Sequence, residues 1–137
     1  MIAMDLNPII KDYLIDEGYR NMEIYPINAY GSSKAPFITW LEFPAVRSSE
    51  AFWMHQSTLT YTVYDNDLSR AKDIAILIQK FLNVGDDIQS IKDAISTESQ
   101  EYRICWSRFT TGGMFPPLER EGYASISRSF DVGFIDV

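Results

Sequence analysis

The stretch that decides the fold is Ser57–Leu82, with the sequence STLTYTVYDNDLSRAKDIAILIQKFL. From Ser57 to Tyr64 apolar or aromatic residues alternate with hydroxyl-bearing ones, the period of two typical of a half-buried strand. The triplet Asp65-Asn66-Asp67 breaks this alternation. Apolar residues then recur every three or four positions, which predicts an amphipathic helix. They are Leu68, Ala71, Ile74, Ala75, Ile78, Phe81 and Leu82.

Shorter elements are predicted before this pair. Asn7-Pro8 predicts the start of a helix, with Asn at the N-cap and Pro at the first helical position, and Gly18 predicts its end. A short strand is expected over 21–27, at an edge or ending early because Pro26 lacks a backbone donor. A stronger strand is expected over 37–43, with Trp40 on a face that is covered at least in part.

The chain after the central pair predicts further elements. Asp86 and Asp87 are candidate caps of a second, shorter helix that extends to Ile95. Strands are expected over 102–110, with Ile104, Trp106 and Arg108 on one face, and over 123–132. The Gly- and Pro-rich stretch between them, 111–122, predicts a loop.

These elements predict one α+β domain that spans residues 1–137. Helices are too few for a parallel array in which a helix follows each strand. We therefore expect a mostly antiparallel sheet of four to five strands with two to three helices packed on one face.

Composition limits the class of protein. A chain of 137 residues with a formal charge of −7 is about one domain, and it contains no basic run of the kind that binds nucleic acid. The single cysteine, Cys105, excludes an internal disulfide and fits a reducing cytosol. No apolar run approaches the roughly 20 residues of a membrane span, and the first residues lack the pattern of a signal peptide.

Two residues are candidates for nucleophilic chemistry. His55 is the only histidine, and Cys105 lies within a strand pattern. A Cys–His pair is one interpretation, although no motif spacing supports it. A structural or surface histidine and a buried, thiol-bearing hydrophobe are the interpretations that the pattern favours.

Acidic and glycine-rich stretches raise two further hypotheses. Asp65-Asn66-Asp67, with Asp86 and Asp87, supplies oxygen ligands, but the central Gly and distal Glu of an EF-hand loop are missing. Capping of the following helix is the favoured role. Gly112-Gly113 lacks the Lys-Ser/Thr of a phosphate loop. We therefore predict no catalytic residue, cofactor site or metal site.

Phe52, Trp53 and Met54 stand together before the central strand. They are either part of the core, which is the more common place for such residues, or a contact patch for another chain. A helix with one apolar face at the N-terminus raises the same alternative.

The order of elements resembles the tail terminator, or tail completion, proteins of long-tailed bacteriophages, and small minor tail proteins of similar size. The likeness covers roughly residues 7–130 and depends on the strand Pro36–Trp40, on Thr60-Tyr61-Thr62-Val63-Tyr64-Asp65 and on the helix that follows. It is a resemblance of pattern, with no diagnostic residue.

The resemblance implies a structural virion protein without a catalytic site. Such a protein forms a homo-oligomeric ring, commonly a hexamer, that ends the tail tube and joins it to the neck or connector proteins. DNA would pass through the ring without sequence-specific binding, no membrane would be involved, and the protein would be located in the virion tail after assembly in the host cytoplasm. The residues expected at the subunit interface are Phe52, Trp53, Met54, Met114, Phe115 and Pro116.

Two alternatives to a tail terminator stay open at this point. The first is a head-tail connector or neck protein of the same virion. The second belongs to another class, a small-molecule binding module or weak enzyme with a pocket between sheet and helices. Trp40, Trp106 and His55 are its expected lining.

Overall fold

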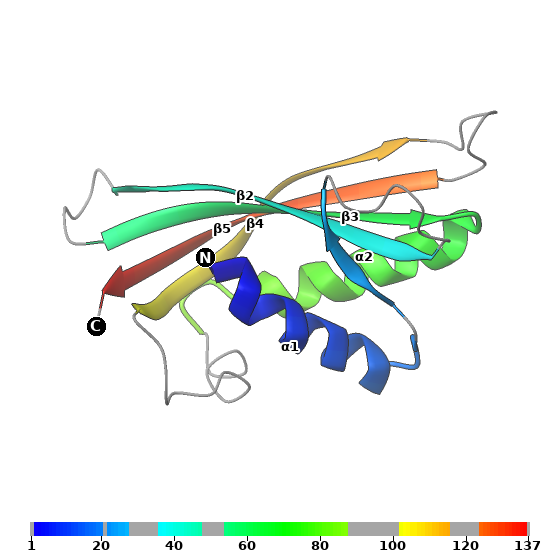
Figure 1. Ribbon diagram of the computed structural model, residues 1–137, viewed down its shortest axis with the longest axis horizontal. Helices are drawn as coiled ribbons and strands as arrows, with labels where there is room; N and C mark the ends of the chain where they lie inside the picture. Colours follow the sequence, from blue (N-terminus) through cyan, green and yellow to red (C-terminus); the bar gives the residue numbers. More distant parts are fainter. Residues whose placement is uncertain are drawn as a thin grey trace.

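The computed structural model describes residues 2–20, 22–27, 36–47, 54–87, 102–115 and 124–136. Within these residues two helices pack against one face of a five-stranded sheet (Figure 1). The helices are α1 (Ile2–Asp16) and α2 (Leu68–Leu82). The strands are β1 (Ile24–Pro26), β2 (Phe37–Arg47), β3 (Met54–Asp65), β4 (Tyr102–Phe115) and β5 (Ala124–Asp136). The expected α+β class is confirmed.

The sheet has the order β1-β2-β3-β5-β4. β1 pairs parallel to β2, and every other pairing is antiparallel. β3 therefore lies in the centre, where Tyr61 stands between Trp40 of β2 and Arg128 of β5. β1 ends at Pro26 and forms one edge, as the missing donor of that proline predicts.

The central strand and helix are confirmed. Leu59, Tyr61 and Val63 are buried on the helix side of β3, whereas the threonines between them lie on the other face. Asp67 is the N-cap of α2, and its side chain accepts hydrogen bonds from the backbone N–H groups of Ser69 and Arg70. The helix buries Ala71, Ile74, Ala75, Ile78 and Leu82.

The predicted start of the first helix is wrong. α1 begins at Ile2, so Pro8 lies inside the helix, and Asn7 accepts a hydrogen bond from the Tyr61 hydroxyl instead of capping. The proline removes one helical hydrogen bond, a cost of about 3 kcal/mol. The extension through Pro8 buries Leu6 one turn before Ile10, and at about 1.5–3 kcal/mol this burial is comparable with the cost.

The predicted end of α1 is confirmed. Gly18 has φ +98°, the left-handed conformation that glycine adopts without strain. Its N–H donates to the Ile15 carbonyl, and the Tyr19 N–H donates to the Leu14 carbonyl. This pair of bonds is a Schellman motif.

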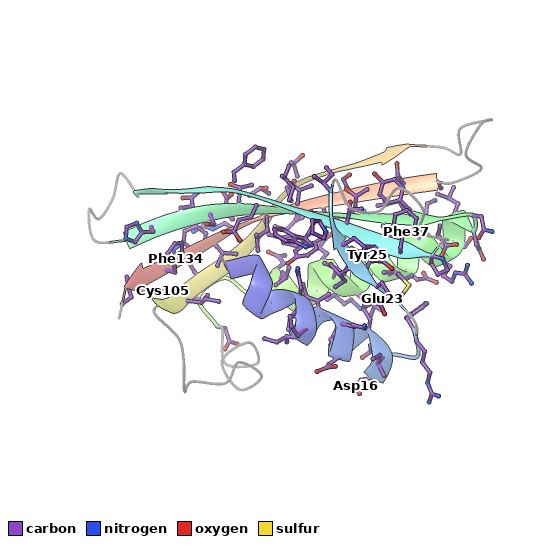
Figure 2. All side chains as sticks on the ribbon, viewed as in Figure 1. Asp16, Glu23, Tyr25, Phe37, Cys105 and Phe134 are labelled. Carbon is purple, nitrogen blue, oxygen red and sulfur yellow. The ribbon has the colours of Figure 1, made fainter. Side chains whose placement is uncertain are left out.

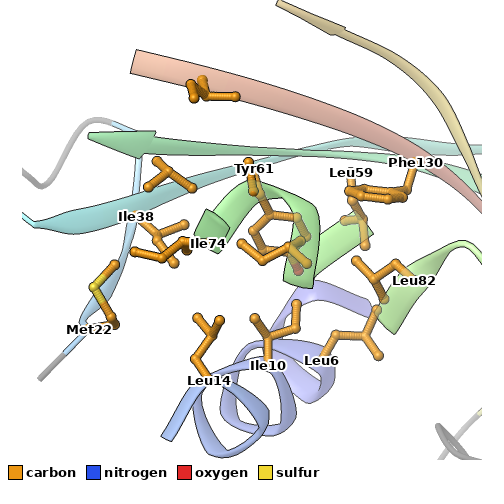
Figure 3. Packing of buried hydrophobic residues seen from close by; sticks show 14 of the residues in the cluster. Leu6, Ile10, Leu14, Met22, Ile38, Leu59, Tyr61, Ile74, Leu82 and Phe130 are labelled. Carbon is orange, nitrogen blue, oxygen red and sulfur yellow. The ribbon is translucent and has the colours of Figure 1, made fainter. Parts of the chain in front are cut away.

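The core lies between the sheet and the two helices (Figure 3). Side chains of α1 point up toward the sheet, and the ring of Tyr61 points down between them and Ile74 of α2. Burial raises the pKa of Tyr61, and the charge of Glu42 raises it further. The largest fully buried side chains are Tyr61, Phe37, Phe130, Leu6, Ile10, Leu14, Met22, Ile38, Leu59, Ile74 and Ile78.

Two predictions about β4 are wrong. The strand continues through Gly112 and Gly113 to Phe115, because those glycines pair with Arg128 and Ser127 of β5 and so need no turn. The strict alternation over 102–110 also fails, since the register shifts between Ile104 and Trp106. Ile104 is buried with the core, whereas Trp106 lies over Gly133 on the other side of the bulge. Cys105, expected to be buried, is only half-buried.

Several expectations lie outside the described residues. They are the short helix that would follow Asp87 and extend to Ile95, the residues Phe52 and Trp53, and positions 116–122 of the loop predicted over 111–122. β2 and β5 both extend beyond their predicted ends, to Arg47 and Asp136.

Candidate interaction surfaces

The face of the sheet opposite the helices carries a ladder of hydroxyl groups across β3 and β5. The Thr58 hydroxyl donates to the Asp131 carboxylate over 2.8 Å. The hydroxyls of Thr60 and Ser129 are 2.9 Å apart, and those of Thr62 and Ser127 are 3.0 Å apart. Within the described part of the chain neither helix lies over this open face (Figure 1). It therefore presents a broad polar stripe.

Aromatic side chains flank that stripe at both ends. Phe37 stacks on Tyr64 at a centroid separation of 5.0 Å, and Tyr25 packs edge-on against Phe37. At the other end Trp106 covers Gly133, and the Arg108 guanidinium lies 4.4 Å from the centre of the indole ring. Figure 2 shows Tyr25 and Phe37 toward one end of the sheet and Phe134 and Cys105 toward the other.

The residues predicted for a subunit interface are not brought together by the fold. Met54 pairs with Ile135 at one end of β5, whereas Phe115 pairs with Ser125 at the other. Ser125 and Ile135 are ten residues apart on β5, and at a rise of about 3.3 Å per residue the two positions are separated by about 33 Å. Met114 belongs to the Phe115 end. Phe52, Trp53 and Pro116 lie outside the described residues.

His55 and Cys105 lie at the same end of the sheet. The imidazole ring of His55 stacks on Phe134 at a centroid separation of 5.3 Å. Ile104, the neighbour of Cys105, pairs with Phe134 from the opposite side. Since β5 lies between the two strands, their backbones are about 10 Å apart at this level. The stacking gives His55 a packing role, and catalysis by this pair stays a hypothesis.

The acidic turn after β3 fixes the start of α2. The Asp65 carboxylate is fully buried and receives two hydrogen bonds from the Arg70 guanidinium, at 2.5 and 2.7 Å. It also accepts the backbone N–H of Asp67 over 3.0 Å. These bonds to Asp65 are the main reason why the pKa of Arg70 is raised. Capping and an ion pair thus occupy the carboxylates of Asp67 and Asp65, two of the four carboxylates that the metal hypothesis invoked.

The pocket expected from sequence has a different lining. Trp40 borders a pocket of about 440 Å³ between α1 and β1. Trp106 lies on the opposite face of the sheet, against Gly133. Tyr61 is the β3 partner of Trp40, and His55 lies six residues before Tyr61. Six residues of a strand span about 20 Å. The prediction that these three residues share a pocket is therefore wrong. The described lining is Asn7, Pro8, Lys11, Glu23, Ile24, Pro26 and Trp40.

A groove between α2 and the β4–β5 edge was not predicted. It comprises adjoining hollows of about 390 and 310 Å³ that share Ile76. The described lining is Lys72, Ile76, Gln79, Lys80, Asn83, Gly112, Gly113, Ile126 and Arg128. The sequence did contain a signal, because Arg128 stands at a position whose neighbours Ile126 and Phe130 are apolar and buried.

Two properties of the described residues bear on class. Neither helix in this part of the chain has the length and apolar character needed to cross a membrane. The same residues include no cluster of three or more His, Cys, Asp or Glu side chains that could hold a metal ion.

A scan against protein-family models and a search of curated proteins found no match to this chain.

Proposed function

We propose that this chain is a structural subunit of a bacteriophage tail. Copies assemble into a ring, commonly of six, that ends the tail tube and joins it to the head-neck complex. The observation that carries the proposal is the open face, where the hydroxyl ladder of β3 and β5 forms a broad surface. The resemblance over residues 7–130 is the reason for assigning the subunit to a phage tail.

The open face supports a contact with other protein chains. Its hydroxyl groups bond to one another across the strands, so the stripe keeps its shape without a partner. Phe43, which precedes the β2 bulge, is 53% exposed. Exposed aromatic residues beside hydrogen-bonding groups are typical of protein interfaces.

The proposed partners are the tail tube protein and the neck or connector proteins. DNA would pass through the ring without sequence-specific contacts, in agreement with a formal charge of −7. The protein would act in the virion tail after assembly in the host cytoplasm, and it would turn over no substrate.

The first experiment measures assembly of the full chain. Native mass spectrometry and negative-stain electron microscopy should show closed rings of one defined size. Purified protein added to tail tubes should bind at one end only, which a gold-labelled tag would locate. A monomer that binds neither tubes nor virions would contradict the proposal.

A neck or connector protein is the alternative within the same virion. It would form a similar ring, so the assembly state cannot distinguish the two roles. The position of the label in intact particles distinguishes the two roles, because a terminator contacts the last ring of the tube, whereas a neck protein contacts the portal side.

The pocket beside Trp40 favours a second candidate function, the binding of a small molecule. An indole ring next to Pro8 and Pro26, with the ion pair of Lys11 and Glu23 at 2.9 Å, suits a flat ligand with a polar group. A ligand screen by thermal shift tests this function. Stabilisation that Trp40→Ala abolishes would support it, whereas equal stabilisation of both proteins would exclude this pocket.

A further inference from the structure

The groove between α2 and β4 is basic in an acidic protein. Lys72, Ile76 and Lys80 are exposed and stand four residues apart, so they form one stripe along α2. None of the ion pairs formed among the described residues involves either lysine. The described lining contains no carboxylate, and Asp73 lies outside it.

The floor of this groove contains a third cation. The Arg128 guanidinium donates to the Gln79 side chain over 3.1 Å and to the Ser127 carbonyl over 2.8 Å. Both acceptors are neutral, although the residue is half-buried. A Cβ at Gly112 would lie 2.7 Å from the guanidinium, so the glycine gives this side chain its room. The charge of Arg128 therefore has no compensating carboxylate among the described residues.

The opposite charge is concentrated on α1. Asp12, Ile15 and Asp16 are exposed and, being three and four residues apart, form one face of the helix. Ile15 is 40% exposed, comparable with Ile76 at 46%. Figure 2 shows Asp16 near the end of α1, on the side away from the sheet. Each helix thus presents an exposed isoleucine flanked by two charges of one sign, and the one opposite charge near each is Asp73 on α2 and, on α1, Lys11, which is paired with Glu23.

The two surfaces lie under different halves of the sheet. α1 packs against β2, whereas α2 packs against β3, β5 and β4. One copy can therefore offer its groove to a second copy and its α1 face to a third. A contact between two different surfaces of the same chain is heterologous, and it closes into a ring when the rotation permits.

We propose that the Lys72–Arg128 groove binds the Asp12–Asp16 face of a neighbouring copy. This inference rests on the proposed function, since it names the contact between ring subunits. Asp12 and Asp16 would face the two lysines and Arg128, and the isoleucines of both helices would be covered together. Opposite charges at a docking surface fix the partner and the register of the contact.

Reversal of charge on both surfaces tests the contact. The first variant combines Lys72→Glu with Lys80→Glu, and the second combines Asp12→Lys with Asp16→Lys. All four side chains are exposed, so circular dichroism should show folded proteins. In each variant the two surfaces carry the same sign. Sedimentation velocity should therefore show self-association weakened at least about tenfold.

Two complementary samples keep the wild-type balance of charge. In an equimolar mixture of the variants, each groove meets an α1 face of opposite sign, so assembly should return. The chain with all four substitutions has the formal charge of the wild type and should assemble alone. A control with Asp86→Lys and Asp87→Lys changes net charge as much as the second variant, and it should assemble normally.

The outcomes separate this contact from the proposed ring. Rings that form equally well from both variants overturn the contact and leave the ring intact. Loss of assembly that neither the mixture nor the fourfold variant restores also overturns it. A wild type that stays monomeric and binds no tail tubes overturns both proposals. Restored assembly in both complementary samples supports the contact.

Discussion

Replacement of Arg70 by methionine should destabilise the protein without any change in the core. The substitution keeps a long apolar stem and removes both hydrogen bonds to the Asp65 carboxylate. That carboxylate is fully buried and would keep only the N–H of Asp67, 3.0 Å away. A buried charge without its partner is the reason for the loss.

The expected loss in the free energy of unfolding depends on how far Asp65 and Arg70 are exposed to water. Breaking a fully buried pair costs about 3–5 kcal/mol, whereas an exposed pair contributes about 0.2–1 kcal/mol. Asp65 has no exposed side-chain surface, but Arg70 is 41% exposed, so water can reach the carboxylate once the guanidinium is gone. We expect the free energy of unfolding to fall by about 2 kcal/mol.

Urea denaturation followed by tryptophan fluorescence measures this loss, in a double-mutant cycle with Asp65→Asn. The double variant should be about as stable as Asp65→Asn alone, because Arg70 then has no carboxylate to bind. Lys72→Met is the matched control on the same helix, and it should lie within about 0.5 kcal/mol of the wild type. A loss below that limit for Arg70→Met, or a coupling energy near zero, would refute the reasoning.

Three further predictions concern single positions. Tyr61→Phe removes the hydrogen bond to Asn7 and should cost about 1 kcal/mol at pH 7. Burial raises the pKa of Tyr61 above the usual 10.0, so the unfolded chain loses the hydroxyl proton at a lower pH than the folded protein does. Above pH 10 the free energy of unfolding of the wild type should therefore fall more steeply than that of Tyr61→Phe, by up to about 1.4 kcal/mol per pH unit. Urea titrations at alkaline pH measure this difference. Gly133→Ala places a Cβ 2.1 Å from the indole nitrogen of Trp106, so it should cost about 1–3 kcal/mol and change the fluorescence of that residue, whereas an unchanged spectrum would contradict the packing. Asp67→Ala removes the N-cap of α2 and should lower the free energy of unfolding by about 0.5–2 kcal/mol, measured in urea, with Asp67→Asn close to the wild type.

The central strand and helix were predictable because their periodicity matches their burial. Each odd-numbered residue from Leu59 to Val63 is buried under the sheet, and the apolar positions that the periodicity predicts for α2 all belong to the core or pack against it. The turn was predictable for a similar reason. Asp67 can cap a helix whatever lies around it, since the bonds are made within one turn.

Other features depend on contacts that the sequence does not display. Pro8 signals the start of a helix locally, but the burial of Leu6 one turn earlier extends α1 toward the N-terminus. Gly112 breaks a strand pattern, yet the pairing with β5 and the room it gives to Arg128 keep it in β4. The bulge at Cys105 shifts the alternation by one residue and so moves Trp106 to the open face.

The candidate surfaces were harder to predict than the fold. Apolar character alone indicates the expected interface residues, whereas the structure places Met54 and Phe115 at opposite ends of the sheet. The groove depends on residues from α2, β4 and β5, which only the folded chain brings together. A charged residue at a core position, such as Arg128, was the one signal available beforehand.

The two rims of the sheet limit how molecules can stack edge to edge. β1 offers three residues and stops at a proline, so a strand from another molecule finds almost no backbone there to join. On the opposite rim Gly85 occupies both backbone groups of Ser107, and the side chain of Asn83 accepts the backbone N–H of Phe109, so the middle of β4 is already bonded. A molecule with one rim closed and the other partly covered resists edge-to-edge stacking into endless fibres.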